Sequence, residues 1–273
     1  MELITLGTGS PIPDPNRAGP ANLVKTGGKD FLFDCGRGVL MRSSAAWTGP
    51  LQFTRVLLTH LHSDHVTDFN DIVTMRWAMS PVEFPLEVVG PVGTKAFVDR
   101  TLAMLQDDIQ YRLDHHDSLN WQPPVNVTEV TEGLVFDEDG IQIFAEQTNH
   151  APVHPTVGYR IEAEGKVVVI AGDTTPCAGL DRLCAGADVY VQTVVRPSLV
   201  EAIPVPRLQD ILDYHSSIRD AAATAANCGV GTLVLTHLVP GPAPGTESEW
   251  ADEAAEGFSG TIIVAEDLMN IPV

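Results

Sequence analysis

The sequence predicts an α/β (α+β) fold in which two β-sheets pack face to face and helices cover their outer sides. Short apolar runs rich in Val, Ile and Leu recur along the 273 residues, and their length suits strands better than helices. Turn sequences at residues 138–140 and 164–166 indicate hairpins, which a purely parallel, doubly wound sheet would lack. We therefore expect early strands in hairpins and later strands in alternation with helices.

The elements follow from these patterns in chain order. Strands are expected at residues 2–6, 30–33, 55–59, 86–89, 141–144, 166–171, 189–192, 232–236 and 261–265. Apolar spacing or composition predicts helices at residues 67–79, 94–105, 218–227 and 247–257. Ser216 and Ser217 offer N-caps to the third of these helices. Residues 239–245 contain three prolines and are expected to form a loop rather than a domain linker, because a strand-like segment follows.

The composition is that of a folded protein with an acidic surface. Asp and Glu number 36 against 16 Lys and Arg, and 44 % hydrophobic residues exclude a disordered chain. A net charge of −20 argues against a surface that grips nucleic acid. The excess is uneven, because residues 201–273 hold two basic and eleven acidic residues, whereas residues 1–60 hold six basic ones. An anionic substrate is therefore expected to approach from the N-terminal half.

Neither a leader nor a membrane span is expected. The first residues lack a basic segment followed by an apolar one, and no stretch approaches the ~18 uninterrupted apolar residues of a span. Four cysteines without a CxxC pair do not suggest a disulfide scaffold. We therefore expect a cytoplasmic protein with no membrane partner.

The most informative segment is residues 59–65, which holds three histidines and a carboxylate directly after an expected strand. His60 and His62 are two positions apart, so they share a face of an extended segment. Asp64 and His65 follow on the turn and can face a second ion. Imidazole and carboxylate are ligands that zinc, manganese and iron accept. The sequence therefore predicts a metal site here.

Other candidate ligands follow other expected strands. His150, Asp173 and His237 each lie just past the C-terminal end of one, where loops gather to form sites. His154 is a weaker candidate beside His150.

Three further histidines lie outside this ligand pattern. His215 directly precedes an expected helix, whose N-terminus favours anions, so it could bind a phosphate oxygen or protonate a leaving group. The alternative is a histidine that only hydrogen-bonds locally near the helix cap. His115 and His116 are expected to be a solvated surface pair.

Taken together, the ligand candidates resemble the seven-ligand pattern of the metallo-β-lactamase superfamily. Accessory phrases are similar to its ribonuclease Z branch of tRNA 3′-processing endonucleases; they lie at residues 6–10, 33–36, 90–94, 158–160, 172–174 and 215–217. The same phrases also resemble arylsulfatase-like and cyclic-nucleotide phosphodiesterase-like members. The resemblance runs from residue 2 to about residue 240 and implies a four-layer αββα metallo-β-lactamase sandwich, with residues 1–273 as a single domain.

The resemblance also implies roles. One metal would be held by His60, His62 and His150, a second by Asp64, His65 and His237, and Asp173 would bridge both. The metals would be two zinc ions, with manganese or iron not excluded, and a hydroxide on them would attack a phosphodiester. Asp64 would accept a proton from the attacking water and His215 would act on the leaving group. Asp34 would either orient a ligand histidine or merely form the turn before Gly36.

Four departures from the ribonuclease Z pattern concern the substrate. Only 22 residues separate His150 from Asp173, which leaves no room for the arm that many family members insert there. Thr193 stands where a glutamate would support His215, and Arg37 stands where glutamate is usual. The loop at residues 11–17 lacks a lysine of the cleavage-site loop, and Arg17 alone remains.

These departures leave the substrate open. A tRNA remains one expected substrate, although the missing arm and the acidic surface argue against it. The alternative is a hydrolase of a small substrate such as a cyclic nucleotide, sulfate ester, lactone or thioester. A metal-binding protein without turnover would be expected to have lost ligands, and an oxygen-using iron enzyme would share the ligand set. A homodimer is suggested by family analogy only.

Overall fold

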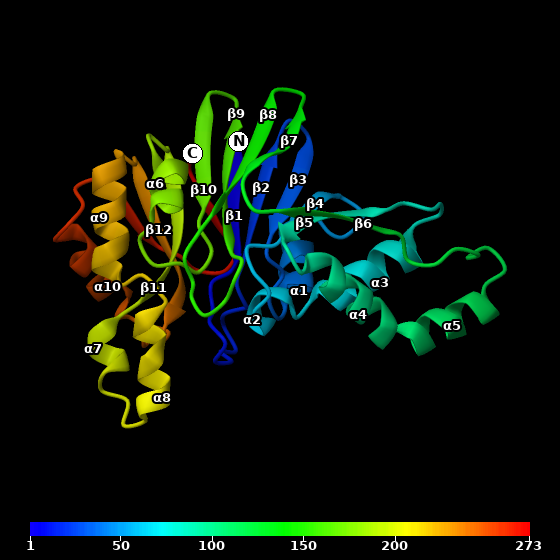
Figure 1. Cartoon of the computed structure of the whole chain (residues 1–273), viewed down its shortest axis with the longest axis horizontal. Coiled ribbons are helices and arrows are strands. Elements are labelled where there is room, and N and C mark those ends of the chain that lie inside the picture. Colours follow the sequence, from blue (N-terminus) through cyan, green and yellow to red (C-terminus); the bar gives the residue numbers. More distant parts are fainter.

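The computed structural model describes residues 1–273 and contains two seven-stranded sheets that face each other, with helices on both outer sides (Figure 1). Three apolar clusters separate the layers: one between the sheets and one under the helices on each outer face. The αββα sandwich predicted from the sequence is therefore confirmed.

The first sheet comes from the N-terminal half plus one C-terminal strand. Its spatial order is β14 (Met269–Ile271), β1 (Glu2–Gly7), β2 (Ala21–Thr26), β3 (Lys29–Phe33), β4 (Phe53–Leu57), β5 (Leu86–Pro91) and β6 (Val125–Val130). The pairs from β14 to β3 are antiparallel, and those from β3 to β6 are parallel.

The second sheet repeats this arrangement. Its spatial order is β13 (Thr261–Val264), β12 (Thr232–Val239), β11 (Val189–Val195), β10 (Lys166–Ile170), β9 (Val157–Ala163), β8 (Ile141–Gln147) and β7 (Gly133–Glu138). The pairs from β7 to β10 are antiparallel, and those from β10 to β13 are parallel. Each half of the chain therefore begins with antiparallel hairpins, and the two hairpin turns expected at residues 138–140 and 164–166 are confirmed.

Helices cover the two outer faces. The first sheet carries α1 (Val39–Ala45), α2 (Ser63–Val66), α3 (Phe69–Met79) and α4 (Thr94–Met104). Helix α5 (Gln106–His115) lies beyond the sheet, where its Ile109 packs in a small cluster with Trp77 of α3. The second half contributes α6 (Ala178–Cys184), α7 (Pro197–Val200), α8 (Pro206–Gln209), the 3₁₀ turn η1 (Asp210–Asp213), α9 (Ile218–Cys228) and α10 (Glu247–Ala255). No helix of the structure combines the length and the apolar character needed to cross a membrane.

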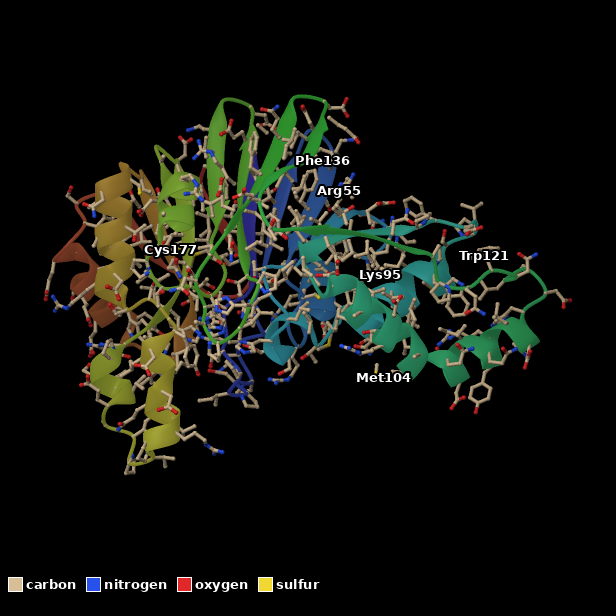
Figure 2. All side chains as sticks on the ribbon, in the orientation of Figure 1. Arg55, Lys95, Met104, Trp121, Phe136 and Cys177 are labelled. Atoms are coloured by element: carbon tan, nitrogen blue, oxygen red, sulfur yellow. The ribbon has the colours of Figure 1, made fainter.

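The core between the sheets is aromatic at one edge. Phe31 of β3 and Phe136 of β7 meet edge to face with ring centroids 5.0 Å apart, so the two sheets are joined by a direct ring contact. Figure 2 shows Arg55 beside Phe136, and its guanidinium carbon lies 5.1 Å from the ring centroid. The aliphatic stem of Arg55 and its charge both favour this position at the edge of the core.

All nine strands and four helices expected from the sequence are present, with shifted boundaries. The strand expected at residues 55–59 is Phe53–Leu57, so the ligand segment begins in an irregular stretch rather than on the strand. His237 lies inside β12 rather than after it, at a φ of 45° beside an irregularity in the β11–β12 register. Five further strands lie outside the expected ranges: β2, β6, β7, β9 and β14. Of these, β6 and β7 are edge strands that are largely exposed and therefore carry little apolar signal.

A buried carboxylate ties the C-terminal loop to the loop that follows β1. Asp267 accepts hydrogen bonds from the backbone N–H groups of Thr8 and Ala18, at 3.0 and 2.6 Å, and from the Thr8 hydroxyl at 2.8 Å. Nε of Arg42 in α1 donates to the same carboxylate at 2.9 Å. Four charge-assisted bonds therefore hold the loop at residues 8–18 against the sheet edge.

Arg76 of α3 plays a similar part beneath the first sheet. Its guanidinium is buried and donates to the backbone carbonyls of Pro50, Phe53, Phe84 and Pro85. It also lies 3.9 Å from the centroid of the Phe84 ring. One cation thus gives a donor to four backbone carbonyls in two loops, of which the bond to Phe53 is buried and the other three are partly buried.

We expect Arg76→Met to lower the free energy of unfolding by about 2–4 kcal/mol, because it removes the donor of one buried and three partly buried carbonyls while keeping the apolar stem. Urea unfolding monitored by circular dichroism measures the change. The control is Arg112→Met on α5, which breaks only an exposed pair with Asp108 and should cost less than about 1 kcal/mol. Equal stability of the two variants would contradict this account of Arg76.

Candidate metal centre

The seven predicted ligands converge at one end of the sandwich. They come from the segments that follow β4, β8 and β10, from α2 and from within β12. All are buried except His62, which is half-buried. Their ligand atoms form two groups in which all atoms lie within 4.8 Å of one another: His60, His62, His150 and Asp173, and Asp64, His65 and His237.

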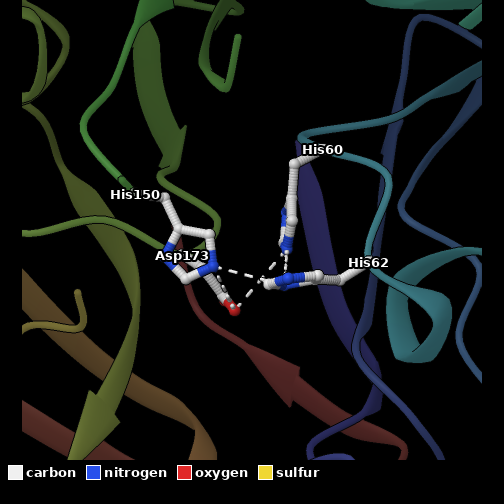
Figure 3. A group of neighbouring side chains, drawn as sticks. All are labelled: His60, His62, His150 and Asp173. Atoms are coloured by element: carbon white, nitrogen blue, oxygen red, sulfur yellow. Dashed lines mark hydrogen bonds and ion pairs between the residues drawn. The ribbon is translucent and has the colours of Figure 1, made fainter. Parts of the chain in front are cut away.

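In the first group, three imidazole nitrogens point at one spot (Figure 3). His62 Nδ1 lies 3.1 Å from His60 Nε2 and 3.3 Å from His150 Nε2. Asp173 Oδ2 lies 3.7 Å from His60 Nε2 and 3.8 Å from His150 Nε2. Three nitrogens and one carboxylate oxygen thus surround a common centre.

The second group is arranged around two carboxylates. His237 Nε2 lies 3.1 Å from Asp64 Oδ2, and His65 Nε2 lies 3.7 Å from the same oxygen. Asp173 Oδ2 is 3.4 Å from His65 Nε2 and 3.7 Å from His237 Nε2. Asp173 was counted with the first group, but its Oδ2 is about as close to the nitrogens of the second group. This oxygen therefore lies where a ligand that bridges two ions would be needed.

A glycine allows Asp173 to reach this position. Gly172 has a φ of 66°, and a Cβ there would lie 2.7 Å from Thr59. Only glycine adopts this backbone conformation without strain and lets the chain pass Thr59 this closely. The loop after β10 thus delivers its carboxylate directly beside the segment that carries His60.

Asp34 orients two of the histidines. Its carboxylate accepts hydrogen bonds at 2.8 Å from His65 Nδ1, from the Thr59 hydroxyl and from the Thr59 N–H. Because the Thr59 hydroxyl proton is used in this way, its oxygen accepts from His60 Nδ1 at 3.0 Å. Both rings therefore carry their proton on Nδ1 and direct the Nε2 lone pair to the centre. Asp34 also has a φ of 58°, so the orienting and turn-forming alternatives are both fulfilled.

His150 is oriented by a backbone group. Its Nδ1 donates to the carbonyl oxygen of Tyr214 at 2.7 Å, which leaves the Nε2 lone pair for the centre. The Tyr214 ring lies against it, with centroids 5.3 Å apart. Sequence reasoning missed both Thr59 and Tyr214, since a hydrogen bond between residues 64 positions apart leaves no local pattern.

His215 is buried beside the centre and belongs to neither group. Its Nε2 lies 3.1 Å from Asp173 Oδ2, and its Nδ1 lies 3.2 Å from the Ile211 carbonyl oxygen. Both partners are acceptors, which suits an imidazole that donates a proton. The helix cap is Ser217, which forms a capping box with Asp220, so His215 has no capping role.

The pocket fits divalent cations. His65 Nε2 and Asp173 Oδ1 are buried without a hydrogen-bond partner, so their lone pairs are available. Burial lowers the pKa of His60, and lowers that of His150 to about 4, so both rings are neutral at pH 7 and can act as ligands.

The buried carboxylates of Asp173 and Asp34 stabilise positive charge in the pocket. Against the effect of burial, the imidazoles of His237 and His65 hold the pKa of Asp173 well below its usual range. Against burial again, Asp173 and Asp34 raise the pKa of His65. A site with these properties stabilises cations, and metal ions can supply that charge.

The remaining histidines lie away from the centre. His154 is exposed and joins neither group. His115 and His116 are exposed at the end of α5, with ring centroids 4.7 Å apart, as expected for a solvated pair.

Comparison with known proteins places the chain in a family. A model of the beta-lactamase superfamily domain matches residues 29–238. The ribonuclease Z of Mycolicibacterium paratuberculosis (strain ATCC BAA-968 / K-10) is 53 % identical over 275 residues, which cover 100 % of this chain and 98 % of that protein. The ribonuclease Z of Mycobacterium tuberculosis (strain ATCC 25618 / H37Rv) is 50 % identical with the same coverage. The chain belongs to the ribonuclease Z family. It is therefore a metal-dependent hydrolase.

Solved structures share the fold of this ribonuclease Z family member. Human tRNase Z, short form, superposes with a TM-score of 0.74 at 23 % identity and covers 100 % of this chain and 99 % of that one. The metallo-beta-lactamase fold protein YhfI from Bacillus subtilis has the same TM-score at 20 % identity, with 99 % and 98 % coverage.

The structure also accounts for the departures from the ribonuclease Z pattern. The short segment between His150 and Asp173 is used by the β9–β10 hairpin. Thr193 is buried in β11 and makes no hydrogen bond to His215, whose Nδ1 is held by a carbonyl instead of a carboxylate. Arg17 donates to the Thr8 hydroxyl and to the Ala265 carbonyl, so the last cation of its loop is bound internally.

We expect Asp34→Asn to weaken zinc binding by about 10- to 100-fold, because the amide nitrogen that replaces one carboxylate oxygen cannot accept a hydrogen bond, so the three bonds from Thr59 and His65 cannot all be kept. Competition with a chromogenic chelator measures this affinity. Asp139→Asn is the matched control, since Asp139 also has a positive φ, of 53°, but lies exposed in the β7–β8 turn. Unaltered zinc affinity in Asp34→Asn would refute the orienting role.

Proposed function

We propose that this chain is a tRNA 3′-processing endonuclease that hydrolyses one phosphodiester bond with the help of two zinc ions. The first ion would be held by His60, His62 and His150, the second by Asp64, His65 and His237, with Asp173 between them. The observation that carries the proposal is the convergence of these seven side chains in a chain that aligns end to end with ribonuclease Z proteins. Zinc is favoured because imidazole-rich sites with carboxylates suit it.

Two residues beside the metal ions would accept or donate protons during the reaction. When bound, two divalent ions would polarise the phosphate and the attacking water. Asp64 presents a carboxylate in the second group and would accept a proton from that water. His215 lies beside Asp173 with its ring nitrogens facing acceptors, so it would donate a proton to the departing oxygen or bind a phosphoryl oxygen.

A tRNA substrate is supported by the relatives rather than by the charge. They align over 273–277 residues and 96–99 % of their length, so they too lack room for a long inserted arm relative to this chain. The missing arm therefore does not separate this chain from proteins named ribonuclease Z. Cytoplasmic location, one domain over residues 1–273 and a homodimer belong to the same proposal, the last by family analogy alone.

A substrate panel on zinc-loaded protein tests the proposal. We expect cleavage of a precursor tRNA at its 3′ end, because the site can bind and polarise a phosphodiester. Bis(p-nitrophenyl) phosphate, cyclic AMP and an aryl sulfate serve as small competitors. Turnover of one of these with no cleavage of precursor tRNA would replace the proposal with the small-substrate alternative.

Two substitutions separate metal binding from proton transfer. His215→Ala should lower kcat by about 10²- to 10⁴-fold with two metals retained, since it removes only a proton donor. Asp173→Ala should lose activity and metal together, because its oxygen faces both groups. Metal content by mass spectrometry and kcat are measured on the same preparations. Metal loss in His215→Ala, or full activity in Asp173→Ala, would show that the roles are misassigned.

A further inference from the structure

Few cations on this acidic protein are free to meet a polyanion. Of the 16 Lys and Arg residues, all but three form an ion pair or hydrogen bond within the chain. The three without such a partner are Arg37, Arg100 and Arg207, and all are exposed. Among the lysines and arginines, these three side chains are therefore the ones that carry no competing partner and are available to an RNA phosphate.

Arg37 is adjacent to the second ligand group. The Cys35 N–H donates to the His65 carbonyl at 2.7 Å, and a Cβ on Gly36 would lie 2.4 Å from the Asp64 carbonyl oxygen. The backbone before Arg37 thus packs directly on the backbone of two ligands. Arg100 lies on α4, between Lys95 and Met104, on the α5 side of the molecule (Figure 2).

Tyr214 lies beside the first ligand group. Its ring centroid is 5.3 Å from that of His150 and 4.8 Å from that of His215, and the side chain is half-buried. The phenol hydroxyl makes no hydrogen bond in the structure, so no partner within the chain fixes the half-buried side chain. An aromatic surface therefore borders the groups assigned to chemistry.

The charge around Tyr214 disfavours a phosphate there. Asp210 and Asp213 are exposed in η1, directly before it, and Glu201 is exposed after α7. Together they outnumber the single cation of this segment, Arg207. A neutral base can approach this side, whereas a phosphate is better received on the Arg37 side.

We propose that the RNA strand crosses the centre in one orientation, with the nucleobase next to the scissile bond stacked on Tyr214 and a backbone phosphate paired with Arg37. This inference rests on the proposed function. Stacking on an aromatic ring tolerates any base, and a guanidinium binds phosphate through two parallel hydrogen bonds. Tyr214 follows α8, Arg37 precedes α1, and α2 carries two of the candidate ligands. In Figure 1, α8 and α1 lie on opposite sides of α2.

Base removal tests the Tyr214 contact. We expect Tyr214→Leu to lower kcat/KM on precursor tRNA about tenfold more than on methyl p-nitrophenyl phosphate, because the small diester has no base at that subsite. An RNA that is abasic next to the cleavage site should lose most of this difference. Tyr214→Phe should retain wild-type behaviour, and Tyr111→Leu, on exposed α5, is the control. An equal loss on intact and abasic RNA would overturn the stacking contact.

Salt dependence tests the Arg37 contact. In Arg37→Gln, the slope of log Kd against log salt concentration for a fluorescein-labelled precursor tRNA should be shallower by about 0.7, as for one lost phosphate contact. Arg100→Gln removes the same charge from an exposed, unpaired arginine and should leave the slope unchanged. A slope that is unaltered in Arg37→Gln, or equally altered in Arg100→Gln, would overturn the assignment.

The two proposals can fail separately. A wild type that binds precursor tRNA with the Arg37 salt dependence but does not cleave it refutes the proposed function and leaves the Arg37 contact standing. A wild type that cleaves precursor tRNA while neither variant shows its signature refutes only the orientation.

Discussion

One oxygen organises the centre of this protein. Asp173 Oδ2 lies within 3.1–3.8 Å of nitrogens from His60, His65, His150, His215 and His237. Burying a carboxylate among several imidazoles is costly unless positive charge is present to balance it. The loops that end β4, β8, β10 and β12 must all close around that charge, so their conformations depend on the same electrostatic constraint.

The backbone is shaped to meet this constraint. Asp34 and His237 have positive φ, and Gly172 passes too close to Thr59 for any other residue. Such conformations are unfavourable for side chains with a Cβ and persist where the surrounding structure holds them. Asp34 also returns hydrogen bonds to Thr59 and His65, so the strained residue is the one that sets the direction of two imidazoles. Asp34 thus combines an unfavourable backbone conformation with the orientation of the candidate ligands.

The few cations of this acidic protein are mostly engaged within the chain. Most cations are used internally, as Arg42 is by Asp267 and Arg76 is by backbone carbonyls, and few remain for a polyanionic partner. Recognition of a nucleic acid would therefore depend on the centre itself and on a small number of neighbouring side chains. This differs from proteins that grip RNA through a broad basic surface, whose binding is distributed over many phosphates.

The sequence alone determined the fold class, the ligand candidates and their order, because hydrophobic periodicity and the clustering of histidines in residues 59–65 are local signals. Asp34 remained undecided between two roles, and Thr59 and Tyr214 were not anticipated. Only the tertiary structure decided these, and it also placed His237 within β12 and bound Arg17 internally. The physical reason is distance along the chain: a hydrogen bond such as that between His150 and Tyr214 exists only after β8 has joined the second sheet and α9 has packed on the outer face of that sheet.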